Sequence, residues 1–156
     1  MFYEPKKGHP FKADPFNALV FPRPIGWISS SSKKGIANLA PYSFFNAIAY
    51  VPPQVMFSAT AYHNRGGLKD SIANILATKE FVVNLATKEL RQQVVQSSID
   101  APNNIDEFKL MKLKKRKSKM VKPPSVAESP VSLECRLLKK IDLKTTSKNK
   151  NQNKMI

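Results

Sequence analysis

Residues 35–59 read GIANLAPYSFFNAIAYVPPQVMFSA and form the longest uncharged, aromatic-rich stretch of the chain. Asn38, Ser43 and Asn46 lie among its apolar residues, and three prolines interrupt it. A membrane-spanning helix would exclude these polar groups and prolines, and a core strand has no need of them. A ligand pocket, which is mostly apolar with a few directed polar groups, would use them.

The composition predicts one folded domain outside the membrane. The 156 residues are 42% hydrophobic, and no apolar run approaches the roughly 20 residues that span a bilayer. The N-terminus has no apolar segment typical of a secretory signal, so we expect a cytoplasmic protein. Cys135 is the single cysteine, and the two histidines, His9 and His63, form no zinc-binding pattern. We therefore expect neither a disulfide nor a metal site.

Positive charge is concentrated in the last third of the chain. Residues 1–108 carry 11 Lys/Arg and 8 Asp/Glu, a net of +3, whereas residues 109–156 carry 15 and 3, a net of +12. The basic stretch 109–122 has no aromatic residue on which a base could stack. A solvated loop is the favoured interpretation, and no nucleic-acid partner is expected, although a basic nucleic-acid-binding module stays the alternative.

Short strands dominate the pattern, and several of them precede the first helix. This order favours a β-barrel or sandwich with helices packed outside over a doubly wound sheet. Residues 1–18 read as an irregular lead-in. The predicted strands are one from Ile25, two pieces hinged at Pro41 within 36–50, one after the turn at 51–53, and a buried strand over 80–85. Helices are predicted over 69–80 and 87–98. A half-buried strand is predicted over 131–143, with Val131, Leu133, Cys135 and Leu137 on one face.

Three segments could bind a ligand. RGGLKDSIANI (65–75) places Arg65, Lys69 and Ser71 at a helix start, which suits a phosphate, although an ordinary capped helix explains it as well. WISSSSKKG (27–35) could hold a phosphate or sugar chain, or form a polar turn. The segment around Pro41, with its aromatic residues, could line a flat slot for a ligand, or its aromatic side chains could simply belong to the core.

No catalytic set stands out. There is no G-x-S-x-G motif, and both histidines fall in predicted loops. Asp106 and Glu107 are adjacent in a polar loop with at most one helical turn, which disfavours general acid–base catalysis. We expect no catalytic side chain of the protein itself.

Taken together, PRPIGWISS, NLAPYSFFNAIAYVPPQVMFSA, KDSIANI, EFVVNL and VKPPSVAESPVSLECRL, in this order, resemble the flavin reductase-like family of FMN-binding split-barrel proteins. The resemblance covers residues 22–138. It implies a mainly β Greek-key split barrel with helices around it, a homodimer, and FMN at or near the subunit interface. It also implies hydride or electron transfer between NAD(P)H as a transient substrate, bound FMN and an acceptor. A non-enzymatic FMN-binding domain is the alternative.

The resemblance assigns the cofactor-binding residues segment by segment. Trp27, Ile28, Ser29 and Ser30 would lie along the ribityl-phosphate side. Asn38, Leu39, Ala40, Ser43, Phe44 and Phe45 would meet the isoalloxazine ring. Lys69, Asp70 and Ser71 would hold the phosphate, and Arg65 is added to them on grounds of charge.

The chain departs from the family pattern after LECRL. Family members continue for several tens of residues with further strands, whereas residues 144–156 read KTTSKNKNQNKMI and lack a strand pattern. We expect the barrel domain to occupy residues 19–143 and to be incomplete, and residues 144–156 to be a disordered tail. The hypothesis is a truncated or frame-shifted product.

Overall fold

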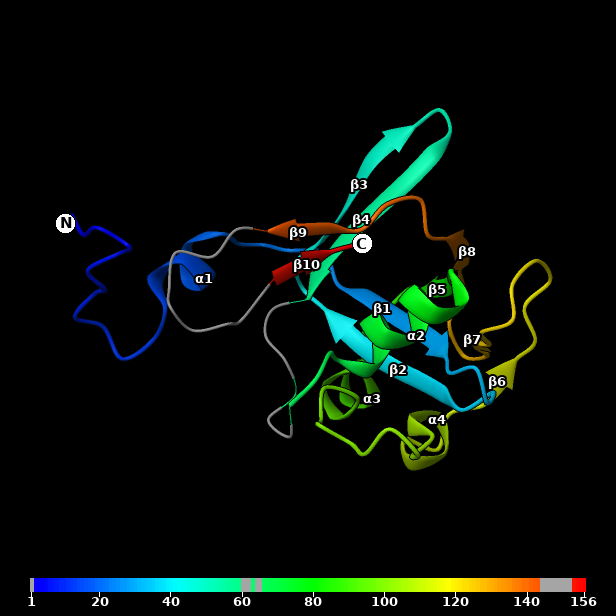
Figure 1. Ribbon diagram of the computed structural model, residues 1–156. Helices are drawn as coiled ribbons and strands as arrows, with labels where there is room; N and C mark the ends of the chain where they lie inside the picture. The colour runs from blue at the N-terminus through cyan, green and yellow to red at the C-terminus, as the bar shows by residue number, and fades with distance from the viewer. Residues whose placement is uncertain (1, 60–62, 64–65, 144–152) are drawn as a thin grey trace.

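The computed structural model describes residues 2–59, 63, 66–143 and 153–156. Two four-stranded antiparallel sheets form its centre (Figure 1). The first has the order β2 (Ala37–Tyr42), β1 (Gly26–Ser31), β5 (Glu80–Asn84) and β8 (Ser132–Arg136). The second has the order β3 (Phe45–Tyr50), β4 (Pro53–Ala59), β10 (Asn153–Met155) and β9 (Ile141–Leu143). A separate small hairpin pairs β6 (Lys115–Arg116) with β7 (Ser125–Val126).

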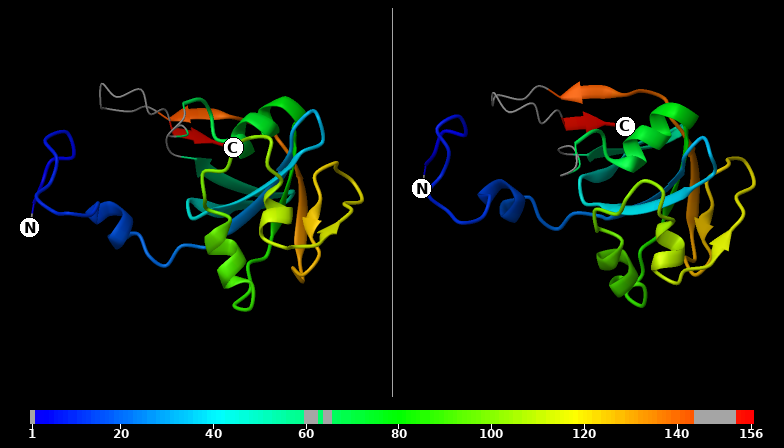
Figure 2. Two further views of the ribbon diagram at one scale, coloured as in Figure 1. Left: turned by 90° about the horizontal axis from the view of Figure 1, so that it is seen from below. Right: turned by 60° about the horizontal axis from the view of Figure 1, so that its bottom comes forward.

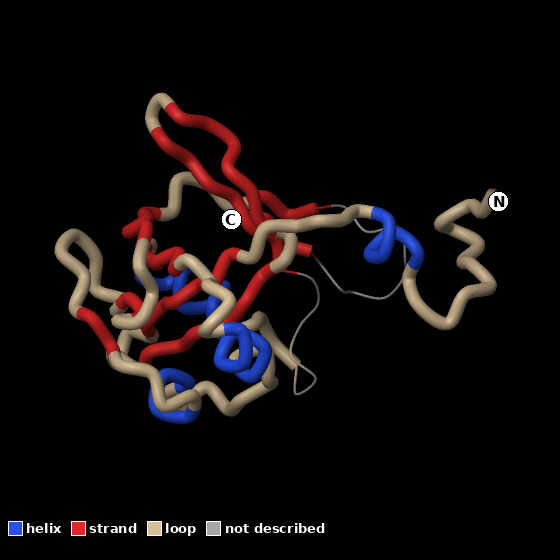
Figure 3. The backbone as a smooth tube through the Cα atoms, turned by 180° about the vertical axis from the view of Figure 1, so that it is seen from behind, coloured by secondary structure: helices blue, strands red, loops and turns tan. Residues whose placement is uncertain are grey.

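Four helices accompany the sheets in the described part of the chain. α2 (Asp70–Thr78) packs on β1 and β2, and α3 (Arg91–Gln96) and α4 (Glu107–Leu110) lie near β2 (Figure 1). α1 (Pro15–Leu19) belongs to an N-terminal arm that stands away from the sheets (Figure 2). The β3–β4 hairpin projects from the body in another direction (Figure 3). No described helix has the length and apolar character that a membrane crossing requires.

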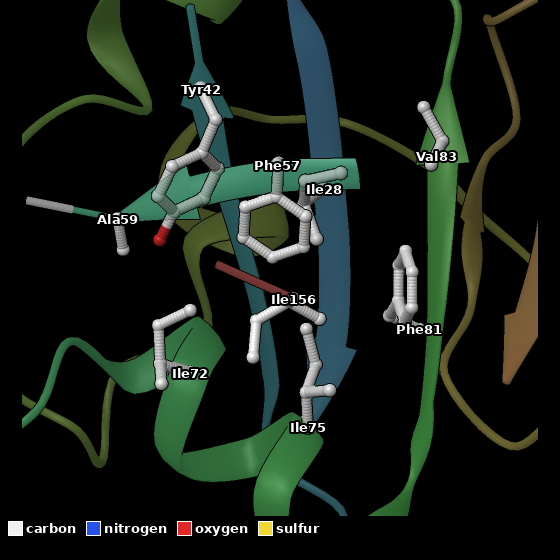
Figure 4. Packing of buried hydrophobic residues seen from close by; sticks show 9 residues of the cluster. All are labelled: Ile28, Tyr42, Phe57, Ala59, Ile72, Ile75, Phe81, Val83 and Ile156. Carbon is white, nitrogen blue, oxygen red and sulfur yellow. The ribbon is translucent and has the colours of Figure 1, made fainter. Parts of the chain in front are cut away.

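Alternation along β1 and β2 divides the core in two, because successive side chains of a strand point to opposite faces. Ile28 and Tyr42 join the cluster between the sheets and α2, together with Phe57 and Ile75 (Figure 4). The other face has its own cluster. It comprises Trp27, Ala37, Leu39, Leu90, Phe108, Met111, Leu113 and Val126.

Gly26 of β1 lies close to the ring of Phe45, where the chain passes from the first sheet into β3. A Cβ atom at this position would lie 2.6 Å from Cδ2 of the Phe45 ring. Real Cβ atoms do not come so near to another carbon, so the ring of Phe45 occupies the space that a side chain would need. The absence of a side chain at Gly26 therefore allows Phe45, the first residue of β3, to pack against the core.

The structure differs from the sequence-based expectations at several places before its last residues. Pro41 is no hinge, because β2 continues through it to Tyr42, and an edge strand tolerates a missing N–H. Residues 1–18 are not wholly irregular, since Asp14 caps α1 by accepting from the N–H of Phe16. The single strand predicted over 131–143 is two strands, β8 and β9, which belong to different sheets.

The end of the chain departs furthest from its prediction as a disordered tail. Lys154 and Met155 pair with Ser58 and Ala59 of β4, and the backbone of Ile156 exchanges two hydrogen bonds with that of Phe57. The side chain of Ile156 enters the core, which explains how a short apolar end can order within a polar segment. Residues 144–152 lie outside the described part of the chain.

Candidate functional site

A cavity of about 550 Å³ opens between the edge of the first sheet, the start of α2 and the loop that joins α3 to α4. This volume is typical of a site for a cofactor or another small molecule. Its lining includes seven of the fourteen residues predicted to bind a cofactor: Asn38, Ala40, Ser43, Phe44, Lys69, Asp70 and Ser71. Segments far apart in the sequence therefore meet at one cavity.

An aromatic wall closes one side of the cavity at the corner between β2 and β3. Ala40, Ser43 and Phe44 line it. The Arg23 guanidinium lies 5.3 Å from the centre of the Phe44 ring, within the range of a cation–π interaction. Arg23 also donates to the carbonyls of Asn17 and Val20, at 2.9 and 3.0 Å, so it links the N-terminal arm to this wall.

The start of α2 forms the charged side of the cavity. Lys69 occupies the N-cap position, and its side chain forms no capping hydrogen bond. The capping bond comes instead from His63, whose Nε2 accepts from the Asp70 N–H at 3.0 Å. His63 in turn binds the Asp100 carboxylate through Nδ1. The first amide of the helix is thus occupied, and Lys69 and Ser71 are the groups at this end that suit an anion.

A buried hydrogen-bond network supports the middle of the cavity. Asn38 accepts from the hydroxyls of Ser71 and Ser30, at 2.6 and 3.2 Å. Its amide nitrogen donates to Oε1 of Glu107 at 2.7 Å, and Oε2 of Glu107 accepts from the Leu39 N–H at 3.0 Å. β2 is an edge strand, so Glu107 satisfies a backbone donor that the sheet leaves unpaired.

Burial changes the acid–base behaviour of two groups at the cavity. Burial raises the pKa of Glu107 to about 7. The hydrogen bonds that Glu107 accepts from Leu39 and Asn38 lower the pKa, and the nearby charge of Asp70 raises it, but burial has the largest effect. Burial also raises the pKa of Tyr42 to about 12, while its hydrogen bond with Ser71 acts in the opposite direction. Tyr42 is therefore a neutral phenol at physiological pH.

Six of the predicted cofactor contacts do not line this cavity. β1 is enclosed along its whole length: Trp27 donates to Ser97 at 2.9 Å and Ser29 to the Pro124 carbonyl at 2.6 Å. Leu39 points to the opposite face of the sheet, as alternation along β2 requires. The predicted residues outside the lining are Trp27, Ile28, Ser29, Ser30, Leu39 and Phe45, and their contact with a cofactor stays a prediction. Arg65 lies outside the described residues.

Sequence reasoning gave Glu107 and His63 no part in the site. The single helical turn expected near Glu107 is α4, which starts where the Asp106 carboxylate accepts from the Phe108 N–H. An N-cap residue followed by an apolar position was the available signal for a helix. Nothing in the sequence indicated that Glu107 would reach β2, because that contact spans 68 residues.

The basic stretch is partly committed to contacts within the protein. Lys115 forms an ion pair with Asp106 and lies over the ring of Phe108. Arg116 donates to the hydroxyls of Ser125 and Ser132, at 3.1 and 3.0 Å. Lys115 and Arg116 are thus held by contacts at the β6–β7 hairpin, whereas a solvated loop was expected for the stretch. Throughout the described ranges, no cluster of His, Cys, Asp and Glu could hold a metal ion.

A second hollow, of about 840 Å³, runs between β4, β8 and the C-terminal strands; we call it the apolar groove. It is bounded mainly by aliphatic, aromatic and sulfur-containing side chains. These include Val55, Met56, Phe81, Leu133, Cys135, Leu137 and Ile156. None of the fourteen predicted cofactor contacts belongs to its described lining.

Comparison with known proteins identifies relatives. The family described as flavin reductase like domain matches residues 18–147. An uncharacterized protein of Aquifex aeolicus is 44% identical over 121 residues, which are 78% of this chain and 61% of that protein. The chain therefore spans about three fifths of that relative's length.

Two solved structures share the fold. Nitrilotriacetate monooxygenase component B from Bacillus cereus matches with a TM-score of 0.86 and 26% identity, over 99% of this chain and 76% of that one. The 2-nitrobenzoate 2-nitroreductase NbaA of Pseudomonas fluorescens matches with a TM-score of 0.75 and 30% identity, over 90% and 64%. The predicted fold class, a mainly β split barrel, is confirmed.

Proposed function

This chain belongs to the flavin reductase-like family, and we propose that its 550 Å³ cavity binds FMN for hydride or electron transfer between NAD(P)H and an acceptor. One observation carries the proposal. The aromatic corner at Ser43 and Phe44 and the helix start at Lys69 and Ser71 border the same cavity, although they were singled out as separate segments. Their chemistry matches the two ends of one ligand, a flat ring system and a phosphate.

The residues present fit this ligand. Ala40 and Phe44 offer an apolar surface for a ring, and the Ser43 hydroxyl and the Asn38 amide add directed polar groups. Lys69 supplies a full positive charge at the end of α2 whose helix dipole favours anions. Carboxylates also border the cavity, and one of them, Asp100, is paired with His63.

In this proposal the flavin, when bound, supplies the redox chemistry, and the protein supplies binding, orientation and shielding. Phe44, backed by Arg23, would hold the plane of the ring. Asn38 is held in place by three side-chain partners and would present its amide at the edge of the ligand. Tyr42 stays protonated and would offer a neutral hydrogen-bonding group instead of a charge.

A homodimer is part of the same proposal. Large apolar side chains are exposed on the N-terminal arm and at the tip of the β3–β4 hairpin, two elements that project from the body (Figure 1). Such projecting apolar surfaces mark protein–protein contacts more often than free surface. The side chains are Phe16, Leu19 and Phe21 on the arm and Ile48, Tyr50 and Val51 on the hairpin.

The test is an FMN titration followed by flavin fluorescence. Lys69→Ala is expected to weaken FMN binding about tenfold, because a charge-assisted contact with the phosphate contributes about 1.5 kcal/mol. Lys88→Ala, an exposed lysine outside the cavity, is the matched control and should bind as the wild type does. Riboflavin, which lacks the phosphate, should not distinguish the two variants.

The same titration separates the alternatives. Saturable FMN binding with NAD(P)H oxidation supports the reductase. Binding without NAD(P)H oxidation would leave a non-enzymatic FMN-binding domain. A folded protein that leaves flavin fluorescence unchanged at all concentrations would refute the proposal.

A further inference from the structure

Glu107 is the most enclosed carboxylate at the cavity, with 5% of its surface exposed. It is the first residue of α4, yet both of its oxygens are turned toward β2. Oε1 accepts from the Asn38 amide at 2.7 Å, and Oε2 accepts from the Leu39 N–H at 3.0 Å. A single side chain thus holds both the backbone and a side chain of the strand that borders the cavity.

The hydrogen bonds around Asn38 all run in one direction. The Asn74 amide donates to Ser30 at 3.2 Å, Ser30 donates to Oδ1 of Asn38 at 3.2 Å, and Ser71 donates to the same oxygen at 2.6 Å. Asn38 then donates through its nitrogen to Glu107. An ionised carboxylate can only accept, so it requires Asn38 to turn its NH₂ group toward α4 and its oxygen toward the two hydroxyls.

We propose that Glu107 is a positioning residue of the flavin site, which sets through Asn38 the direction in which the Ser71 hydroxyl donates. This inference rests on the proposed function. Ser71 lies at the start of α2 and lines the cavity, where the phosphate of the flavin is placed by that proposal. In this arrangement Glu107 acts on the ligand indirectly, through Asn38 and Ser71.

Protonation of Glu107 reverses this arrangement. The new O–H must donate, and it meets an acceptor once the Asn38 amide turns by 180° and presents its oxygen. The Asn38 NH₂ group then donates to Ser71, so the Ser71 hydroxyl, which also forms a hydrogen bond with Tyr42, no longer donates to Asn38 and can donate to a ligand in the cavity. The cavity thereby gains the Ser71 hydroxyl as a donor and loses the negative charge of Glu107, and both changes favour the binding of an anionic ligand. Flavin binding should therefore tighten when Glu107 takes up a proton.

The pH range of this change follows from the surroundings of Glu107. Burial raises its pKa to about 7, so the proton is exchanged near neutral pH. The titratable and charged groups around it come from every element that borders the cavity. They are Tyr42 on β2, Lys69 and Asp70 at the start of α2, the His63–Asp100 pair, and Asp106 with its partner Lys115 beside α4.

The experiment compares the FMN dissociation constant of three proteins between about pH 6 and about pH 8. Glu107→Gln presents an N–H donor to Asn38 and a carbonyl acceptor to Leu39, as the protonated acid does. The ratio of the wild-type to the Glu107→Gln dissociation constant is expected to rise roughly fivefold from the acidic to the alkaline end, a typical coupling between two sites. The exposed Glu89 gives the matched control: Glu89→Gln should follow the wild type. The phosphate of FMN titrates in the same way with all three proteins, so its effect cancels in the ratio of two dissociation constants measured at the same pH.

The outcomes separate this inference from the proposed function. A Glu107→Gln profile that runs parallel to the wild-type profile, so that the ratio of their dissociation constants is the same at both ends of the range, overturns the role of Glu107 and leaves flavin binding intact. Absence of FMN binding at every pH refutes the proposed function and the inference with it. If Glu107→Gln does not fold, carbon-13 NMR of the wild-type carboxyl decides: saturating FMN should raise its titration midpoint, and an unchanged midpoint overturns the role.

Discussion

The two large hollows of this molecule differ in kind more than in size. The apolar groove is the larger, at about 840 Å³, and its walls are mostly aliphatic and aromatic. The cavity at the start of α2 measures about 550 Å³ and is bordered by amides, hydroxyls, carboxylates and one lysine. Apolar contact is non-directional, whereas hydrogen bonds fix the orientation of a ligand. The smaller hollow is therefore the better candidate for a cofactor site.

The polar cavity is also the more constrained of the two. Asn38 is held by Glu107, Ser30 and Ser71, and His63 holds the first amide of α2. A side chain with several fixed partners keeps its orientation before a ligand arrives, which lowers the entropic cost of binding. In the groove, Leu133 and Cys135 keep considerable exposure and have no comparable set of directed contacts among the described residues.

The largest contrast between the two hollows should come from truncating one residue in each. Asn38→Ala leaves Glu107 buried without one of its donors, and is expected to lower the free energy of unfolding by about 2–4 kcal/mol. It should also weaken FMN binding about a hundredfold, since both ring and phosphate sides depend on Asn38. Urea unfolding and the fluorescence titration measure the two effects.

The matched change in the groove is Leu133→Ala. Because Leu133 is nearly half exposed, we expect a loss of about 1 kcal/mol or less and unchanged FMN binding. If Leu133→Ala weakened FMN binding as much as Asn38→Ala does, the assignment of the flavin to the polar cavity would be wrong.

The single cysteine reports on the groove. Burial raises the pKa of Cys135 from 9.0 to about 11, which reduces the thiolate present at neutral pH about a hundredfold. Its alkylation by iodoacetamide should be slower than that of a free thiol by about this factor, and saturating FMN should not change the rate. Protection of Cys135 by FMN would indicate that the flavin enters the groove.

The cavity should also make the stability of the protein depend on pH. The raised pKa of Glu107 means that the folded protein binds its proton more tightly than the unfolded chain does. This stabilisation is fully present below the ordinary pKa of about 4.5 and is lost as the pH rises through about 7. The free energy of unfolding should therefore fall by on the order of 2 kcal/mol between about pH 5 and about pH 8.

Glu107→Gln should remove this slope, whereas Glu89→Gln should keep it. Chemical denaturation at several pH values is the measurement. A wild-type stability that rises across this range would show that Glu107 is ionised more readily in the folded protein than in the unfolded chain.

The sequence predicted the local features of the fold and of the site well. Polar residues within an uncharged aromatic stretch indicated a ligand wall, and Asn38, Ser43 and Phe44 do line the cavity. Helical spacing of Ile72 and Ile75 predicted α2, and both residues enter the core. These features depend on neighbours in the sequence, so composition and periodicity were sufficient to find them.

Long-range features could not be predicted in this way. The sequence does not say which face of β2 meets the cavity, so Leu39 was included although it points to the opposite core. The carboxylate of Glu107 reaches β2 across 68 residues, and the backbone of Ile156 pairs with that of Phe57 across a still longer stretch of sequence. Only the folded chain brings such groups together, and burial then gives Glu107 a pKa that no local pattern indicates.

The measurement that most directly tests the location of the site is an NMR titration of the isotope-labelled protein with FMN. The account predicts saturable shifts concentrated at the backbone amides of Asn38, Ala40, Ser43 and Ser71, with the groove amides of Val55 and Leu133 unchanged. Shifts concentrated in the groove, with Asn38 and Ser71 unchanged at saturation, would contradict it.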